Sequence, residues 1–328
     1  EEVIRFYGYE HIVPSFLKSA EVTSGGLNER QRRELKLKET LAGAGMYEAV
    51  HYSFFSPADL KLFRYPEDSE ALRAIRILNP ISEELSLMRT VLSPSMANAV
   101  MRNQKAGNLS GRLFELAKVF IPKSLPLTEY PEERTHLALA FFGKEESFFT
   151  LKGALDLAAE SLHVKFRYEA SSEPFTHPYQ TAAVYVGDVK VGYIGKLAYD
   201  IAGELNLRTD AYLAELDFEA IESLPHEPGY FTPLPKFPEV QRDLALVMDK
   251  AISCEQVVNL IRGCSPLIRE VKLFDVYEGA PIPPTKKSLA FTLTFRPEEQ
   301  AFTPEELDKL TQEILETLKT SCDIALRV

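Results

Sequence analysis

A run of prolines divides this sequence and limits what it can fold into. Five prolines fall within residues 224–238, and the sequence on either side has the apolar patterning of packed domains. Because proline fixes φ and has no N–H to donate, neither a helix nor a central strand can cross such a segment. We therefore predict a semi-extended linker over residues 225–238, with a folded domain before it and another after it.

Length and composition agree with two folded domains. The chain has 328 residues, of which 45% are apolar and 26% are charged, values that exclude the collagen-like, disordered and disulfide-rich classes. Its net charge of −11 provides no field that attracts phosphate, so composition alone argues against nucleic-acid binding. The three cysteines form no C-x-x-C pair, so we expect reduced thiols, a cytoplasmic location and no thiol-bound metal.

Two further features concern the chain as a whole. The longest clean apolar run, residues 137–142, is far shorter than the roughly 18 residues of a membrane-spanning helix. The first residue is Glu1 rather than Met, so we expect the sequence to begin inside a longer protein.

Helix and strand signals alternate before the linker. Asn28 can cap a polar helix that stops near Gly43, and the serine of Ser56-Pro57 and of Ser93-Pro94 can cap two more. A further helix is expected at residues 150–163. Strands are expected at 49–54, 112–120 and 136–142, and at 182–186 and 189–194, which Gly187-Asp188 joins as a hairpin. This domain is therefore predicted to be α+β with a substantial antiparallel sheet.

The order of elements after the linker is simpler. Strands are predicted at 243–248, 268–277, 287–295 and 324–328, with helices starting at Ser253 and Thr303. This βαββαβ order is typical of the ferredoxin-like fold. Because that fold serves many functions, the topology does not decide what this domain does.

A set of ordered motifs after the linker is more specific. These are Phe237-Pro238, residues 242–247, 273–279 and 286–291, and a closing Leu326-Arg327. Together they resemble the ferredoxin-fold anticodon-binding domain of bacterial phenylalanyl-tRNA synthetase β subunits.

The sequence before the linker resembles the same subunit. Residues 1–9 are similar to the end of the domain that precedes its core, and residues 78–82, 88–90 and 113–116 are similar to the core itself. The resemblance implies four segments. They are the end of a truncated domain (1–18), a non-catalytic class II synthetase-like core with an antiparallel sheet (19–224), the linker (225–238) and the anticodon-binding domain (235–328).

The segment 273–279 carries the candidate base-binding residues. Strand alternation puts Asp275 and Tyr277 on one face and Phe274 and Val276 on the other. A phenol ring is a stacking platform, and a carboxylate can accept from N1–H and N2–H of an unstacked guanine. The resemblance implies that Asp275, Tyr277 and an exposed Ser288 bind the anticodon of the phenylalanine tRNA. The first base of that anticodon is guanine in the family. Without the resemblance, a half-buried strand with a solvent-exposed Asp and a packing Tyr is the favoured interpretation.

Three cations near these motifs are candidate phosphate contacts. Lys286 and Lys287 precede a strand, and Arg242 begins another. Lysine and arginine commonly meet phosphate at nucleic-acid interfaces. Cations at such positions are more often a solvated strand edge, so these roles are weaker predictions.

The resemblance also implies a magnesium site. In the family, Glu1 and Glu2 would hold Mg²⁺ with two upstream aspartates, in a site shared with the α subunit. Those aspartates are absent from this sequence. We therefore expect weak or no Mg²⁺ binding by this chain.

The core lacks a group that catalysis would need. The catalytic α subunit has an arginine, which would hold the ATP α-phosphate, shortly after the strand that residues 112–120 resemble; here Ile121-Pro122-Lys123 follows. We therefore expect no catalytic residues in this chain and ATP bound mainly by α. The implied assembly is an α2β2 tetramer that attaches phenylalanine to its tRNA using ATP and Mg²⁺.

Two other functions remain open from the residues alone. One is an autonomous enzyme whose core binds a nucleotide. The other is a protein-interaction module without direct RNA contact, which the acidic balance favours.

Overall fold

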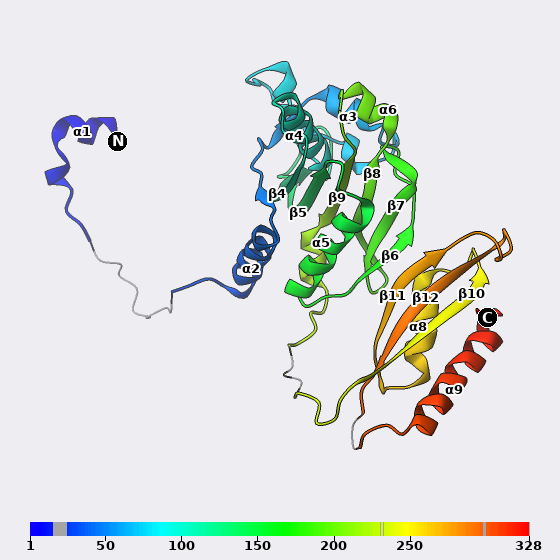
Figure 1. The fold of residues 1–328 in the computed structure, drawn as a ribbon. Helices are drawn as coiled ribbons and strands as arrows, with labels where there is room; N and C mark the ends of the chain where they lie inside the picture. The colour runs from blue at the N-terminus through cyan, green and yellow to red at the C-terminus, as the bar shows by residue number, and fades with distance from the viewer. Residues whose placement is uncertain (16–24, 230, 232, 298–299, 328) are drawn as a thin grey trace. The chain divides into compact units, whose positions relative to one another are not determined.

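The computed structural model describes residues 1–15, 25–229, 231, 233–297 and 300–327. These divide into two compact units, Glu1–Gly229 and Tyr230–Val328 (Figure 1). The predicted boundary between residues 18 and 19, two residues of the predicted linker, and Val328 lie outside the described residues. None of the described helices is long and apolar enough to cross a membrane.

A seven-stranded sheet forms the centre of the first unit. Its order is β1-β4-β5-β9-β8-β7-β6; β1 pairs with β4 in parallel, and the other neighbours are antiparallel. The predicted hairpin at Gly187-Asp188 is confirmed and joins β7 to β8. The strands are β1 (Tyr47–Glu48), β4 (Gly111–Ile121), β5 (Glu132–Phe142), β6 (Phe166–Ala170), β7 (Thr176–Val186), β8 (Val189–Leu197) and β9 (Ala211–Asp217).

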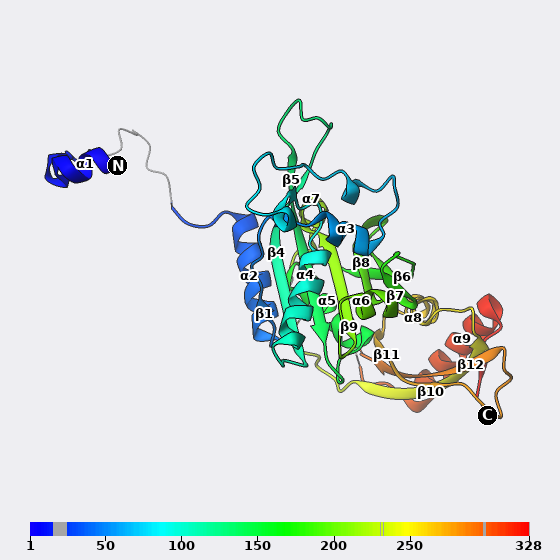
Figure 2. The ribbon, with the colours of Figure 1, turned by 90° about the horizontal axis from the view of Figure 1, so that it is seen from above.

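Helices cover both faces of this sheet (Figures 1 and 2). On one face α2 (Glu29–Gly43), α5 (Phe148–Ser161) and α7 (Phe218–Ser223) pack on an apolar cluster that includes Leu139 of β5. On the other, α3 (Pro57–Phe63), α4 (Ser93–Lys105) and α6 (Tyr199–Glu204) pack on a second cluster that includes Ala140. Successive residues of β5 therefore face two cores, which explains its continuous apolar run.

The remaining elements of this unit are short. They are α1 (Glu2–Tyr7), β2 (Phe54–Phe55), β3 (Leu87–Met88) and three 3₁₀ turns at Tyr9–His11, Glu70–Leu72 and Glu83–Leu85.

The predicted strand over residues 49–54 is wrong. Regular pairing stops after Glu48, and Ala49 makes one more backbone bond to Phe114, at 2.7 Å. At His51 both the backbone N–H and ring Nδ1 bond to the carboxylate of Glu115, at 3.3 and 2.6 Å. A side chain thus satisfies the backbone that a strand ladder would otherwise pair.

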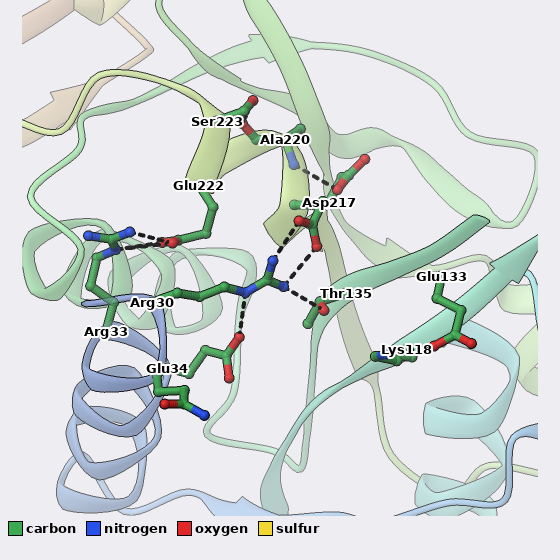
Figure 3. Close-up of polar contacts among 12 residues, drawn as sticks. Arg30, Arg33, Glu34, Lys118, Glu133, Thr135, Asp217, Ala220, Glu222 and Ser223 are labelled. Atoms are coloured by element: carbon green, nitrogen blue, oxygen red, sulfur yellow. Dashed lines mark hydrogen bonds and ion pairs between the residues drawn. The ribbon is translucent and has the colours of Figure 1, made fainter. Parts of the chain in front are cut away.

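Two arginines fasten α2 to the rest of the unit (Figure 3). The Arg30 guanidinium donates to both oxygens of Glu219, at 2.6 and 2.8 Å, and to Thr135 Oγ1 at 3.0 Å. One turn on, Arg33 donates to both oxygens of Glu222. The hydrogen bond from Arg30 lowers the pKa of the Glu219 carboxyl. Bidentate pairs of this kind fix orientation as well as distance, so α2 is held to α7.

A buried carboxylate starts α4. The predicted helix is confirmed, but Ser93 is not its cap: the cap residue is Leu92, which makes no side-chain cap bond. Instead, Glu215 of β9 accepts the N–H groups of Leu92 and Ser93, at 2.9 and 2.8 Å, the Ser93 hydroxyl, and His136 Nδ1 at 2.7 Å. Burial favours the neutral acid, but the hydrogen bond and charge of His136 and the bonds from α4 hold the pKa of Glu215 below its ordinary value.

A second buried carboxylate pairs with Arg89. The Arg89 guanidinium lies 3.0 Å from Glu115 and also donates to the Lys118 carbonyl at 2.8 Å. Arg89 is 3% and Glu115 is 2% exposed. Burial favours the neutral acid, but the hydrogen bond from His51 and the charge of Arg89 lower the pKa of Glu115. Arg89 and Glu115 therefore form a buried ion pair.

The second unit has the predicted βαββαβ order. Its antiparallel sheet runs β11-β12-β10-β13, and α8 and α9 pack on one face around an apolar cluster that includes Leu246, Phe291 and Ile314. No described helix of this unit packs on the opposite face, which we call the helix-free face. The elements are β10 (Val240–Asp249), α8 (Cys254–Cys264), β11 (Ile268–Tyr277), β12 (Lys286–Phe295), α9 (Pro304–Cys322) and β13 (Ala325–Leu326).

Candidate nucleic-acid interface

One extra residue in β11 decides which side chains reach the helix-free face. The pairing register with β12 shifts between Leu273 and Asp275, which leaves Phe274 in a β-bulge. Before the shift Leu273 faces the helices; after it Val276 takes the helix side, and Asp275 and Tyr277 take the helix-free face. Because side chains alternate along a strand, a regular β11 would have put residues 271, 273, 275 and 277 on the helix side.

The bulge brings the predicted residues together. Tyr277 lies opposite Ser288 of β12, and Asp275 lies opposite its neighbour on that face, Ala290. Asp275 is exposed, and Tyr277 is 36% exposed. Ser288, expected to be exposed, is instead 2% exposed, because it lies on a central strand between Tyr277 and Val247 of β10. Phe274, expected to face away with Val276, is the bulge residue and is 55% exposed.

Arg327, for which no role was predicted, belongs to the same surface. Its backbone N–H donates to the Ala245 carbonyl at 2.7 Å, which continues the β13 pairing by one residue. Its guanidinium lies 4.9 Å from the centre of the Tyr277 ring. The Tyr277 hydroxyl donates to the Ala280 carbonyl at 2.7 Å, so the ring is fixed at its tip and faces a planar cation. Leu326-Arg327 is one of the motifs found in the sequence. The contact of Arg327 with Tyr277 depends on the order of strands in the sheet, which local sequence patterns do not show.

The predicted phosphate contacts are already engaged. Arg242 pairs in register with Leu293 on the helix side, and its guanidinium lies 4.0 Å from Asp308 of α9. Lys286 Nζ lies 4.0 Å from Asp323, and Lys287 Nζ donates to the Lys250 carbonyl at 3.1 Å. The structure therefore does not bring Arg242 to the face that carries Tyr277.

Glu1 and Glu2 lie at the exposed start of the chain. Glu2 begins α1 and pairs with Arg5 at 3.0 Å. Throughout the part of the chain that the structure describes, no group of three or more His, Cys, Asp or Glu side chains could hold a metal ion. Two exposed carboxylates, one of them paired with an arginine, do not fit a complete Mg²⁺ site.

The catalytic α subunit is expected to have an arginine shortly after the strand that β4 resembles. In this chain the residues at the end of β4 are Ile121, Pro122 and Lys123. Ile121 is 7% exposed and packs in the apolar cluster beneath α4. Lys123 is exposed and pairs with Glu129 at 2.8 Å. The strand thus ends on a packed apolar residue, and the first cation after it is engaged with a carboxylate.

Two family models match the two units. Residues 13–218 match the phenylalanyl tRNA synthetase beta chain CLM domain, and residues 235–327 match the ferredoxin-fold anticodon binding domain. This chain belongs to the phenylalanyl-tRNA synthetase β-chain family.

Curated relatives of this β-chain family align over the whole chain. The phenylalanine–tRNA ligase β subunits of Clostridium tetani and Halalkalibacterium halodurans are each 35% identical to it over 100% of its length. The chain spans about two fifths of those relatives, 41% and 42%. Among solved structures, a pyrrolysyl tRNA synthetase of Desulfitobacterium hafniense aligns with 59% of this chain and 68% of its own at 16% identity, with a TM-score of 0.47.

Proposed function

We propose that this chain is the part of a phenylalanine–tRNA ligase β subunit that reads the anticodon of the phenylalanine tRNA and supports the catalytic α subunit. The observation that carries the proposal is the helix-free face, where a bulge places Asp275 beside Tyr277 in the domain that matches the anticodon-binding family. The relatives that align over the whole chain bear the name of this subunit.

The chemistry of this face suits an unstacked guanine. The exposed carboxylate of Asp275 can accept from N1–H and N2–H, and the Tyr277 ring provides a stacking surface. Arg327 already stacks on that ring, so an incoming base either displaces the guanidinium or lies between it and the ring. Ser288 is covered in the free chain and reaches a base only after side chains above it move, so Asp275 and Tyr277 have the primary roles.

The first unit is proposed to bind the α subunit in an α2β2 tetramer. It exposes large apolar side chains on two segments, Tyr47, Val50 and Tyr52 after α2, and Leu78 and Ile81 around Asn79-Pro80. Leu78 is fully exposed and Ile81 is 81% exposed, values typical of side chains that a partner covers. ATP and phenylalanine would bind on α. Mg²⁺ would bind with ligands from outside this chain in addition to Glu1 and Glu2.

This function assigns a role to each segment and a place in the cell. Residues 19–224 form the non-catalytic core, 225–238 the linker and 235–328 the anticodon-binding domain, all in the cytoplasm where the tRNA is charged.

The test is the affinity of the holoenzyme for its tRNA. With α and full-length β, Tyr277→Ala should weaken binding by about 5–150-fold, which corresponds to the loss of about 1–3 kcal/mol of stacking. Tyr179, 91% exposed on the first unit, provides the matched control, and Tyr179→Ala should bind as the parent does. Equal affinity of the Tyr277→Ala enzyme and its parent would favour an assembly module that does not touch RNA.

A further inference from the structure

We propose that a cationic pocket at the far end of the β11–β12 pair binds backbone phosphates of the same RNA whose base lies on Tyr277. The proposal rests on the proposed function and extends it to a site that the family motifs do not include. The pocket has a volume of about 450 Å³ and lies wholly within the second unit.

Three cations from separate parts of the chain line this pocket. Lys236 precedes β10, Arg269 is the second residue of β11, and Arg296 follows β12. Among the residues that the structure describes, no carboxylate lines the pocket, and none of the three cations forms an ion pair. An anion that entered here would therefore meet positive charge that no acidic side chain of the described lining offsets.

The pocket is also partly preformed. One N–H of Arg296 donates to the Pro233 carbonyl at 2.6 Å, which positions the guanidinium and leaves its other donors for a ligand. Four prolines supply much of the remaining wall: Pro233, Pro235, Pro266 and Pro297. Proline rings are rigid and bring no N–H, so little conformational entropy is lost when a ligand binds.

Charge distinguishes this pocket from the rest of the unit. Residues 235–328 contain 12 Lys or Arg and 15 Asp or Glu, so the unit is mildly acidic. Of the three cations predicted from sequence to meet phosphate, Arg242 and Lys286 each have a carboxylate 4.0 Å away, and Lys287 donates to the Lys250 carbonyl. Phosphate binding therefore fits this pocket, whose described lining contains no carboxylate, better than those positions.

The separation from Tyr277 suits one RNA arm. Arg269 and Tyr277 lie eight residues apart on β11, but two register shifts shorten the paired stretch to the seven residues of β12 between Phe295 and Ser288, or about 23 Å at 3.3 Å per residue. Successive base pairs of an RNA duplex lie roughly 3 Å apart along its axis, so roughly eight steps span this distance. A hairpin whose loop base stacks on Tyr277 can thus place phosphates of its stem at the pocket.

The test compares two double variants in the holoenzyme of α and full-length β. Arg269→Gln/Arg296→Gln removes two charges from the pocket, and Arg262→Gln/Lys319→Gln removes two cations that do not line it. Affinity for the phenylalanine tRNA is measured from 50 to 200 mM salt. The pocket variant should weaken binding at least tenfold at 50 mM and reduce the salt slope by about 1–2, while the control keeps the parent slope.

The base dependence completes the test. The pocket variant should lose the same factor in affinity, relative to the parent, for the natural tRNA and for a tRNA with a substituted first anticodon base. Phosphate contacts carry no sequence information, so the loss should not depend on the base. Lys236→Gln, an exposed single change, should shift the slope in the same direction by about half as much or less. Parent-like slopes in both pocket variants, or a loss that depends on the base, would overturn the proposal. If the pocket variants bind normally while Tyr277→Ala weakens binding, the pocket is wrong and the anticodon function stands.

Discussion

Replacing Glu215 tests whether a buried carboxylate holds α4 on the sheet. Its two oxygens accept four donors: the N–H groups of Leu92 and Ser93, the Ser93 hydroxyl, and His136. In Glu215→Gln, one oxygen becomes an NH₂ group that faces two of them. If the NH₂ group replaces Oε1, the His136 ring can turn to accept from it, but the N–H of Leu92 loses its acceptor. If it replaces Oε2, the Ser93 hydroxyl can turn to accept from it, but the N–H of Ser93 loses its acceptor. In either orientation one backbone N–H stays unpaired.

The expected cost follows from that count. One buried unpaired N–H costs about 1–3 kcal/mol, so Glu215→Gln should lower the free energy of unfolding of the first unit by that amount. Glu215→Ala leaves both N–H groups unpaired and should cost about 2–6 kcal/mol. The control is Glu133→Gln, which breaks the exposed pair with Lys118 and should cost less than about 1 kcal/mol.

The stability that Glu215 contributes should depend on pH in a defined direction. Because the folded-state pKa of Glu215 is lowered, its contribution is complete above its unfolded pKa of about 4.5 and is lost as pH falls through the folded value. The difference between parent and Glu215→Gln should therefore be constant near pH 7 and shrink below about pH 4.5. Urea unfolding followed by circular dichroism measures it. A difference below about 0.5 kcal/mol at pH 7, or one that grows in acid, would show that the Glu215 carboxylate does not hold α4.

Three further outcomes follow from the same structure. Arg89→Ala leaves Glu115 as an uncompensated buried charge and should cost the first unit about 3–5 kcal/mol, measured by urea unfolding; a cost below 1 kcal/mol would show that the pair is not desolvated. Arg327→Ala should change the stability of the second unit by less than about 1 kcal/mol yet change tRNA affinity several-fold, and unchanged affinity would mean that Arg327 does not touch the base. Isothermal titration of this chain with ATP should show no saturable heat, whereas a Kd below 1 mM would support an autonomous nucleotide-binding enzyme.

Much of the fold could be predicted from local patterns. The cap and proline at Ser56-Pro57, the Asn28 cap with Gln31, and the Gly187-Asp188 turn all specify local geometry, and each element appears as expected. The strand expected at 49–54 failed because Glu115, more than sixty residues away, takes the hydrogen bonds of His51. Ser93 failed as a cap for a similar reason, since a carboxylate from a distant strand does the capping.

The candidate site shows the same limit more sharply. Alternation alone predicts that Asp275 and Tyr277 share one face of β11 and that Val276 lies on the other. Which of these faces points away from the helices is decided by the bulge at Phe274. A bulge is a property of the paired strands and leaves no clear mark in the sequence of one of them. The burial of Ser288 and the contact of Arg327 with Tyr277 likewise depend on strand order.

The role proposed for Asp275, recognition of the first anticodon base, can be measured on a single functional group of that base. Aminoacylation by α and full-length β is measured with tRNA carrying guanine or inosine at that position, because inosine lacks the N2 amino group. The parent enzyme should lose about 10–100-fold in kcat/KM on the change to inosine, the value of a hydrogen bond to a charged group. Asp275→Asn should lose much less on the same change, while the exposed control Asp188→Asn behaves as the parent. Equal losses for the parent and Asp275→Asn would contradict the assignment of Asp275 to the guanine edge.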